Sequence, residues 1–162
     1  MEFRTQRKEG DLSKAPPVDV QQSSASTVVR TDAAWRKEDK KAGFGWTVRS
    51  VTSHELRQKK QVEHVSSALM AEGLAIREAL LCCRRQGLNS IHLQSDSSQL
   101  ISAINRKEPL TKIHGILSDI LNLCCSPAML ISFSWIPRDQ NFVADSLSKE
   151  ALCMVGAFTA PT

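Results

Sequence analysis

The amino-acid sequence predicts an α/β fold, in which a mixed five-stranded sheet carries helices on both faces. Two observations lead to this prediction. Three strand-like segments joined by short links come first, which is typical of an antiparallel meander. After them, strand-like and helical segments alternate, which is typical of parallel strands joined by crossovers. The expected sheet therefore combines a three-stranded meander with two parallel strands.

The first three strands are expected at residues 27–35, 43–48 and 56–65. The first is rich in Val and Thr. The second alternates large side chains with Gly or Thr, so we expect a half-buried strand whose second face is approached closely by another element. The third is more polar, and its Lys59 and Lys60 are typical of an edge strand, where they discourage aggregation.

Helices and strands then alternate along the rest of the chain. Ser66 or Ser67 is expected to cap a helix that runs to about Gln86, and Gly87 suits its carboxyl end. Asp139 or Asn141 is expected to open the last helix, which reaches about Met154. Between these two helices we expect a strand at 91–96, helices at 97–106 and 112–125, and a strand at 130–136. The predicted order is β-β-β-α-β-α-α-β-α.

Composition indicates one domain. We expect a disordered N-terminal arm at 1–26, because this segment has no periodicity and contains Pro16 and Pro17. The domain is expected at 27–155, followed by a short tail at 156–162. Apolar residues make up 41% of the 162 residues, which is enough for a core.

Charge and hydropathy limit the classes of function. The net charge of +4 permits a polyanionic partner without requiring one. No apolar run reaches the roughly 18–20 residues that span a bilayer. The first twenty residues are polar, unlike a signal peptide. We therefore expect a soluble, intracellular monomer with no membrane partner.

Several residue types that often carry chemistry have structural interpretations here. The cysteines lack the CxxC spacing of a zinc site, so we interpret them as small hydrophobic residues. The four histidines show no ligand spacing. The tryptophans are expected in the core or on a sheet face rather than as base-stacking platforms: Trp35, Trp46 and Trp135.

Four carboxylates stand where carboxylates are costly or well placed for a ligand. Asp32 falls inside the first strand, where Asp is disfavoured. Glu72 lies on the otherwise apolar stripe of the first helix, so we expect it to face the sheet. Asp96 ends the fourth strand, and open α/β sheets bind ligands at the carboxyl ends of their strands. Asp145 lies in the first turns of the last helix.

Two of these acids also have structural alternatives. Asp96 could act as the N-cap of the following helix. Asp145 could interact favourably with the amino end of its own helix. Taken together, however, four carboxylates on one small sheet cannot all stay ionised without compensation. Hard divalent cations supply it, and oxygen-only ligands favour Mg²⁺ or Mn²⁺.

Four segments, in order, resemble the ribonuclease H family (type 1 fold), especially its plant reverse-transcriptase-like branch. The match covers about residues 28–152, nearly all of the predicted domain. The segments are DAAW at 32–35 with GFGW at 43–46, AEGLAIREAL at 71–80, QSDS at 94–97, and WIPRDQN at 135–141 with VADSLS at 143–148.

The resemblance implies a site and an activity. The family's catalytic quartet falls on Asp32, Glu72, Asp96 and Asp145. By resemblance, Asp32 bridges two Mg²⁺ or Mn²⁺ ions, Glu72 and Asp96 complete one metal site, and Asp145 helps to hold the other. The family cleaves the RNA strand of RNA–DNA hybrids and leaves a 5′-phosphate and a 3′-hydroxyl. The implied partner is therefore an RNA–DNA hybrid, which is recognised partly through the 2′-hydroxyl of RNA.

Two departures leave other functions open. Many family members carry a mobile His before the last acid, whereas the loop at 137–141 has none; we expect Arg138 to take part of that role by contacting a phosphate. The family's basic insertion between the middle helices is also missing. The alternatives are a catalytically weak or inactive nucleic-acid-binding module derived from a retroelement, and a protein-interaction domain that kept only the fold.

Overall fold

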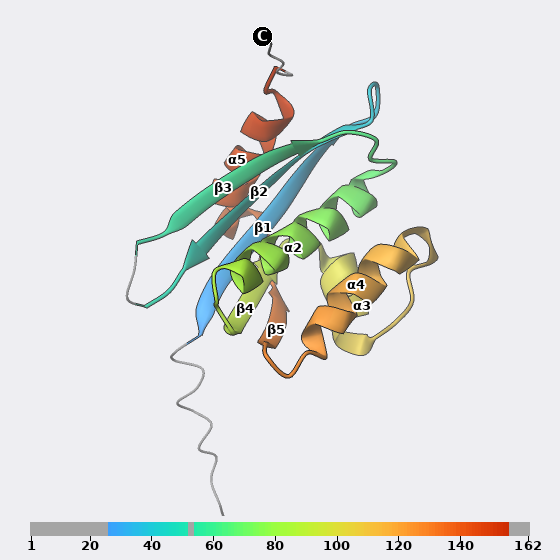
Figure 1. The fold of residues 1–162 in the computed structure, drawn as a ribbon. Helices are drawn as coiled ribbons and strands as arrows, with labels where there is room; N and C mark the ends of the chain where they lie inside the picture. The colour runs from blue at the N-terminus through green and yellow to red at the C-terminus, as the bar shows by residue number, and fades with distance from the viewer. Residues whose placement is uncertain (1–25, 52–53, 156–162) are drawn as a thin grey trace, which may run out of the picture.

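The computed structural model describes residues 26–51 and 54–155. The predicted arm, apart from Ser26, and the predicted tail lie outside the described residues. The elements follow the predicted order, with two 3-10 turns added (Figure 1). They are β1 (Thr27–Arg36), β2 (Lys41–Arg49), β3 (Leu56–Val62), α2 (Ala68–Arg85), β4 (Ser90–Ser95), α3 (Ser98–Arg106), the turn Thr111–Ile113, α4 (His114–Cys124), β5 (Leu130–Trp135), the turn Arg138–Gln140 and α5 (Phe142–Leu152).

The sheet has five strands in the order β3-β2-β1-β4-β5. Strands β1, β2 and β3 pair antiparallel as a meander. Strand β4 pairs with β1 in parallel, and β5 pairs with β4 in parallel. The predicted mixed sheet is therefore confirmed, and β3 is an edge strand as its lysines indicated.

Helices cover both faces of the sheet. Helix α5 packs on β1, β2 and β3, and α2 packs on β1 and β2 from the opposite face (Figure 1). Helix α3 contacts β5, and α4 packs beside α2. The core lies mainly between the sheet and helices α2, α3 and α4, where apolar side chains such as Val29, Leu80 and Leu93 are wholly buried.

Two element ends follow from local chemistry. Ser67 is the N-cap of α2, and its hydroxyl accepts a hydrogen bond from the backbone N–H of Met70 at 3.0 Å. Gly87 follows this helix with a φ of +79°, in the left-handed region that glycine adopts readily. Strand β3 ends at Val62, three residues before its predicted end.

The close approach predicted for one face of β2 is made by α5. A Cβ atom added to Gly43 or Gly45 would collide with the backbone of this helix at Ala144, Ser148 and Leu152. The two glycines therefore let α5 lie directly on the sheet. This contact fixes how near the helix comes to β1, the neighbouring strand.

Two interpretations of side chains need correction. Trp46 is buried, but Trp135 is 51% exposed, because β5 is an edge strand that ends beside it. Cys82 and Cys83 are buried, whereas Cys125 and Cys153 are exposed, because each caps the end of a helix rather than facing the core. Within residues 26–51 and 54–155, no helix is long and apolar enough to cross a membrane.

Candidate metal centre

The register of two parallel strands brings Asp32 and Asp96 together. Thr31 pairs with Ser95, and the pairing of β1 with β4 ends there. Asp32 is the next residue of β1 and Asp96 directly follows β4, so the two residues diverge from the same point of the sheet. This point is the carboxyl end of β4, and open α/β sheets place ligands at the carboxyl ends of their strands.

Helix α2 adds the third carboxylate. It crosses the face of β1 and β2, and Glu72 lies one turn into it, on the side that faces the sheet. Asp32, Glu72 and Asp96 each offer a carboxylate oxygen, and these oxygens all lie within 4.8 Å of one another. The structure thus brings three of the four predicted acids together from three separate elements.

Burial makes the ionised forms of these acids costly. Asp32 is only 4% exposed. Its pKa is raised from 3.8 to about 7, chiefly by burial and further by the charges of Asp96 and Asp145, although a hydrogen bond from Ser148 opposes the rise. Burial also raises the pKa of Glu72 well above its usual range, with the charges of Asp32 and Asp96 adding to the effect.

Two buried oxygens of the cluster lack hydrogen-bond partners: Oε1 of Glu72 and Oδ2 of Asp96. Buried polar atoms are normally satisfied, so an orphaned pair in one cluster calls for an explanation. A hard divalent cation fits this arrangement, because it accepts carboxylate oxygens and compensates their charge. Asp32, Glu72 and Asp96 are therefore suited to hold Mg²⁺ or Mn²⁺.

Asp145 stands beside the three-acid cluster and is not one of its members. It lies in the first turn of α5, and its side chain is 24% exposed. Its carboxylate pairs with Lys149, one turn further along, at 3.1 Å. Its charge nevertheless raises the pKa of Asp32. Its place in the first turn of α5 agrees with the structural alternative of an interaction with the amino end of the helix, but Asp145 also affects the cluster electrostatically.

Arg138 lies on the rim of the site. Its Nε atom is 3.8 Å from Oδ2 of Asp96, too far for a hydrogen bond, and its side chain is 78% exposed. Its charge lowers the pKa of both Asp32 and Glu72, but it ranks behind the effects that raise them. One exposed guanidinium therefore only partly compensates the negative charge of the cluster.

The structural alternative for Asp96 is wrong. The N-cap of α3 is Ser97, and its side chain makes no capping hydrogen bond. The backbone N–H of Ser97 donates instead to the hydroxyl of Ser95 at 3.0 Å. The Asp96 side chain is 4% exposed and has an unsatisfied oxygen, so helix capping does not account for it.

Three residues around the site were missed from the sequence. Ser148 donates to Oδ2 of Asp32 at 2.8 Å. Asn141 is buried and donates from Nδ2 to the carbonyl of Thr31 at 2.9 Å. Trp135 donates from Nε1 to the carbonyl of Asp96 at 3.1 Å. Only Ser148 had a sequence signal, since its offset of three residues places it on the same side of the helix as Asp145.

The fold and the acidic site define the class of protein as ribonuclease H-like. The family model described as reverse transcriptase-like matches residues 30–151. The chain therefore belongs to the reverse transcriptase-like family. A comparison with curated protein sequences finds no match.

Solved structures share the fold at low sequence identity. RNase H1 from the archaeon Halobacterium salinarum NRC-1 is 21% identical, with a TM-score of 0.70 over 78% of this chain and 97% of that one. The N-terminal RNase H domain of Rv2228c from Mycobacterium tuberculosis is 20% identical, with a TM-score of 0.69 over 79% and 94%. LC11-RNase H1, isolated from compost, was solved in complex with RNA/DNA hybrid. It is 19% identical, with a TM-score of 0.69 over 78% and 96%.

Proposed function

We propose that this chain is a metal-dependent endonuclease that hydrolyses the RNA strand of RNA–DNA hybrids. The observation that carries the proposal is the convergence of three carboxylates, one buried and two partly buried, whose oxygens lie within 4.8 Å of one another. Two of those carboxylates have an orphaned oxygen, and one distant guanidinium is the nearest compensating cation among the described residues. A purely structural role gives no reason to bury this much negative charge.

The proposed roles follow the position of each acid. Asp32 stands at the centre and would contact both of two Mg²⁺ or Mn²⁺ ions. Glu72 and Asp96 would complete one metal site, and Asp145 would turn from Lys149 to help hold the other. When bound, two divalent ions supply an activated water and stabilise the leaving oxygen of an in-line displacement.

The chain's other groups would position the substrate. Arg138 is exposed and lies at the rim, so its guanidinium can swing towards a phosphate oxygen while Asp96 holds it near the site. The substrate class is supported by LC11-RNase H1, whose structure holds an RNA/DNA hybrid on the same fold. The charge of +4 is compatible with this polyanionic partner.

The test is cleavage of an end-labelled RNA–DNA hybrid with Mg²⁺ or Mn²⁺, beside the variant Asp32→Asn. We expect the RNA strand alone to be cut, only with metal, and no cutting by the variant. Circular dichroism would verify that both proteins are folded. A folded wild-type protein that cuts nothing in either metal would reject the enzyme.

The same hybrid, with the variant Asp96→Asn added, tests the alternative of a binding module. In that case the hybrid should bind without being cut, and binding should be unchanged or tighter in Asp96→Asn, because a negative charge near phosphates is removed. Binding should also weaken steeply as salt rises. No hybrid affinity at any salt concentration would instead favour a protein-interaction domain.

A further inference from the structure

We propose that Ser148 is a positioning residue for the metal centre: its hydroxyl holds the carboxylate of Asp32 in the orientation that ligates the cation. This inference rests on the proposed function, since it concerns the same site. Ser148 lies on α5, across the sheet from the helix that supplies Glu72. It is wholly buried, so its hydroxyl is not an incidental surface group.

The contact between Ser148 and Asp32 depends on Gly45. Gly45 pairs with Asp32 across the β1–β2 ladder. Because it has no side chain, the backbone of α5 can settle on this spot, where a Cβ atom would meet the carbonyl of Ala144 and the amide of Ser148. The glycine beside Asp32 thus allows the serine of another element to reach the carboxylate.

A second contact fixes the start of the same helix. Asn141 precedes α5 and is 1% exposed, and its amide donates to the carbonyl of Thr31. Helix α5 is therefore joined to β1 at two successive residues, Thr31 and Asp32. These two hydrogen bonds leave the helix little freedom to slide along the strand.

The hydroxyl of Ser148 has two acceptors within reach and one proton to donate. Oδ2 of Asp32 lies at 2.8 Å and the carbonyl of Asp145 at 2.9 Å. An ionised carboxylate is the stronger acceptor, so Asp32 accepts the hydrogen bond from Ser148 when it is charged.

The bond engages only one oxygen of Asp32. Ser148 donates to Oδ2, and it is the side chain whose hydrogen bond acts on the pKa of this carboxylate. Ser148 therefore restricts rotation of the carboxylate while leaving an oxygen free for a cation. Partners that orient a metal ligand in this way typically change metal affinity by about 10–100-fold when removed.

The experiment measures Mn²⁺ binding to the full chain by isothermal titration calorimetry, without substrate. The variants are Ser148→Ala, which removes the donor, and Ser148→Thr, which keeps a hydroxyl. The matched control is Ser146→Ala, an exposed serine on the same helix. Thermal melts of the metal-free proteins would show that the variants are folded.

We expect Ser148→Ala to weaken Mn²⁺ binding by about tenfold or more, while Ser148→Thr restores most of the affinity and Ser146→Ala matches wild type. If Ser148→Ala does not fold, Ser148→Cys replaces it, because sulfur is a weak donor of nearly the same size. Unchanged affinity in the folded variant that lacks the donor would overturn the proposal. The proposal would also be overturned if Ser148→Thr melted like wild type but lost as much Mn²⁺ affinity as Ser148→Ala.

Asp32→Asn separates this inference from the proposed function. If wild type binds Mn²⁺ and Asp32→Asn does not, the metal centre stands and the Ser148 variants decide the positioning role. If wild type and Asp32→Asn bind equally weakly, the metal centre fails and the role of Ser148 fails with it.

Discussion

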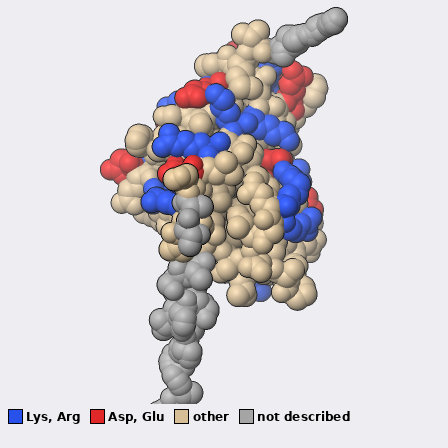
Figure 2. Space-filling view, turned by 60° about the vertical axis from the view of Figure 1, so that its left-hand side comes forward, with Lys and Arg blue, Asp and Glu red and all other residues tan. Residues whose placement is uncertain are grey.

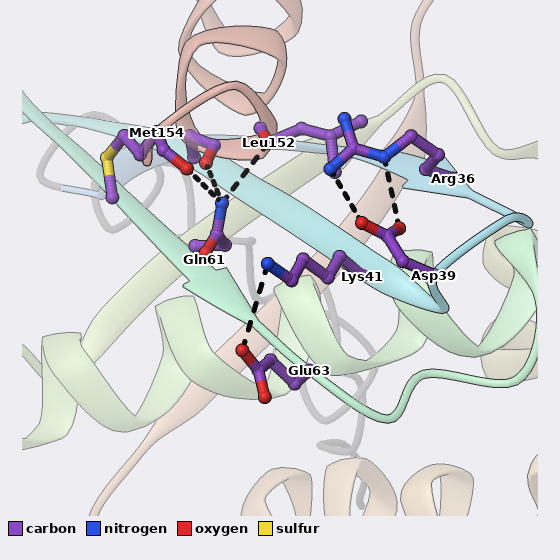
Figure 3. A network of polar contacts seen from close by, with 8 residues as sticks. Arg36, Asp39, Lys41, Gln61, Glu63, Leu152 and Met154 are labelled. Atoms are coloured by element: carbon purple, nitrogen blue, oxygen red, sulfur yellow. Dashed lines mark hydrogen bonds and ion pairs between the residues drawn. The ribbon is translucent and has the colours of Figure 1, made fainter. Parts of the chain in front are cut away.

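Carboxylates at the β1–β2 turn and the β3 edge differ sharply from those at the point where the pairing of β1 with β4 ends. At the first place Asp39 and Glu63 each have a cation beside them (Figure 3). Asp39 accepts two hydrogen bonds from Arg36, at 3.0 and 2.9 Å, and Glu63 lies 3.9 Å from Lys41. The pKa of Asp39 is lowered, chiefly by its hydrogen bond to Arg36.

The same pairing continues along the edge strand. Lys59 and Lys60 pair with Glu150 and Glu78, at 2.9 and 3.4 Å. On the face seen in Figure 2, basic and acidic side chains lie next to one another and do not form one uninterrupted basic patch. Most of this charge is compensated locally, so it does not form a strong field for a polyanion.

Polar side chains at this edge are also satisfied by the backbone. Nε2 of Gln61 donates towards the carbonyls of Ala151, Leu152 and Met154, at 3.0, 3.1 and 2.9 Å (Figure 3). These carbonyls lie at the carboxyl end of α5, where a helix has no partners of its own. Gln61 therefore has a complete structural explanation.

At the centre the same residue types lie close together, and the cation nearest to Asp96 is the exposed Arg138, at 3.8 Å. Asp32 and Glu72 have raised pKa values, whereas Asp39 has a lowered one. The difference lies in burial and in the scarcity of nearby cations, not in the amino-acid type. It indicates that the edge acids belong to the fold and that the central acids belong to a ligand site.

The largest expected effect is on cleavage, from Asp96→Asn. If Asp96 ligates metal directly, as proposed, its removal should lower turnover of the hybrid by more than about 100-fold, because loss of even the outer partners of metal ligands costs about 10–100-fold. The matched control is Asp119→Asn, since Asp119 is 52% exposed and pairs with Arg77 at 2.6 Å. Equal turnover in both variants would remove the distinction between central and paired acids.

The second prediction concerns stability without metal. The pKa of Asp32 is about 7 when folded and 3.8 in the unfolded chain, so the folded state binds the proton more tightly. Its contribution to stability is therefore present at low pH and is lost as pH rises towards 7. Between pH 5 and 8 the free energy of unfolding should fall by about 2–3 kcal/mol on this account.

Urea unfolding in a chelator would measure this effect. Asp32→Asn should remove the part of the decrease that comes from Asp32 and be more stable than wild type at pH 8, while the raised pKa of Glu72 accounts for the remaining decrease. Adding Mg²⁺ should restore the stability that wild type loses at high pH, but should not stabilise Asp32→Asn. Asp39→Asn is the control: the pKa of Asp39 is lowered, so its contribution is lost only at pH values below this window. An identical pH slope in wild type and Asp32→Asn would contradict the assignment of a buried, uncompensated Asp32.

The sequence predicted the elements more completely than the site. Periodicity and the lysines of β3 were enough for the strand order of the meander and its edge, because these features are local. The apolar stripe of α2 was enough to turn Glu72 towards the sheet. The register of β1 with β4, which places Asp32 beside Asp96, depends on how distant segments pair and left no local signal.

The contacts around Asp32 could not be predicted from the sequence, because they too depend on how distant segments pack. Ser148 reaches Asp32 only because Gly45, more than a hundred residues earlier, admits α5 to the sheet. Asp139 or Asn141 was expected to open the last helix, and Asn141 is its N-cap residue, but the Asn141 side chain bonds to β1 and makes no capping hydrogen bond. Asp145 was predicted as an equal member of a quartet, whereas its pairing with Lys149 sets it apart from the three-acid cluster.

A smaller effect is expected from Arg138→Ala. Arg138 is 78% exposed, so its removal should leave the fold intact. Turnover should fall by about tenfold, the loss of one charge-assisted hydrogen bond of about 1.5 kcal/mol, while Mn²⁺ binding survives. The matched control is Arg106→Ala, which is 71% exposed and lies 3.9 Å from Glu108. Unchanged turnover would show that Arg138 does not contact the substrate.

The smallest effect is expected from Asp39→Asn, which breaks the ion pair with Arg36. Exposed pairs contribute little, so the melting temperature should fall by less than about 3 °C and hybrid cleavage should be unchanged. The difference from wild type should shrink further at high salt, because salt screens exposed charges.

Thermal melts with and without Mg²⁺ complete the comparison: the ion should stabilise Asp39→Asn as much as wild type but should not stabilise Asp96→Asn. If Mg²⁺ stabilised all three proteins equally, it would be binding outside the central acids, and the contrast between the two regions would no longer identify a metal centre.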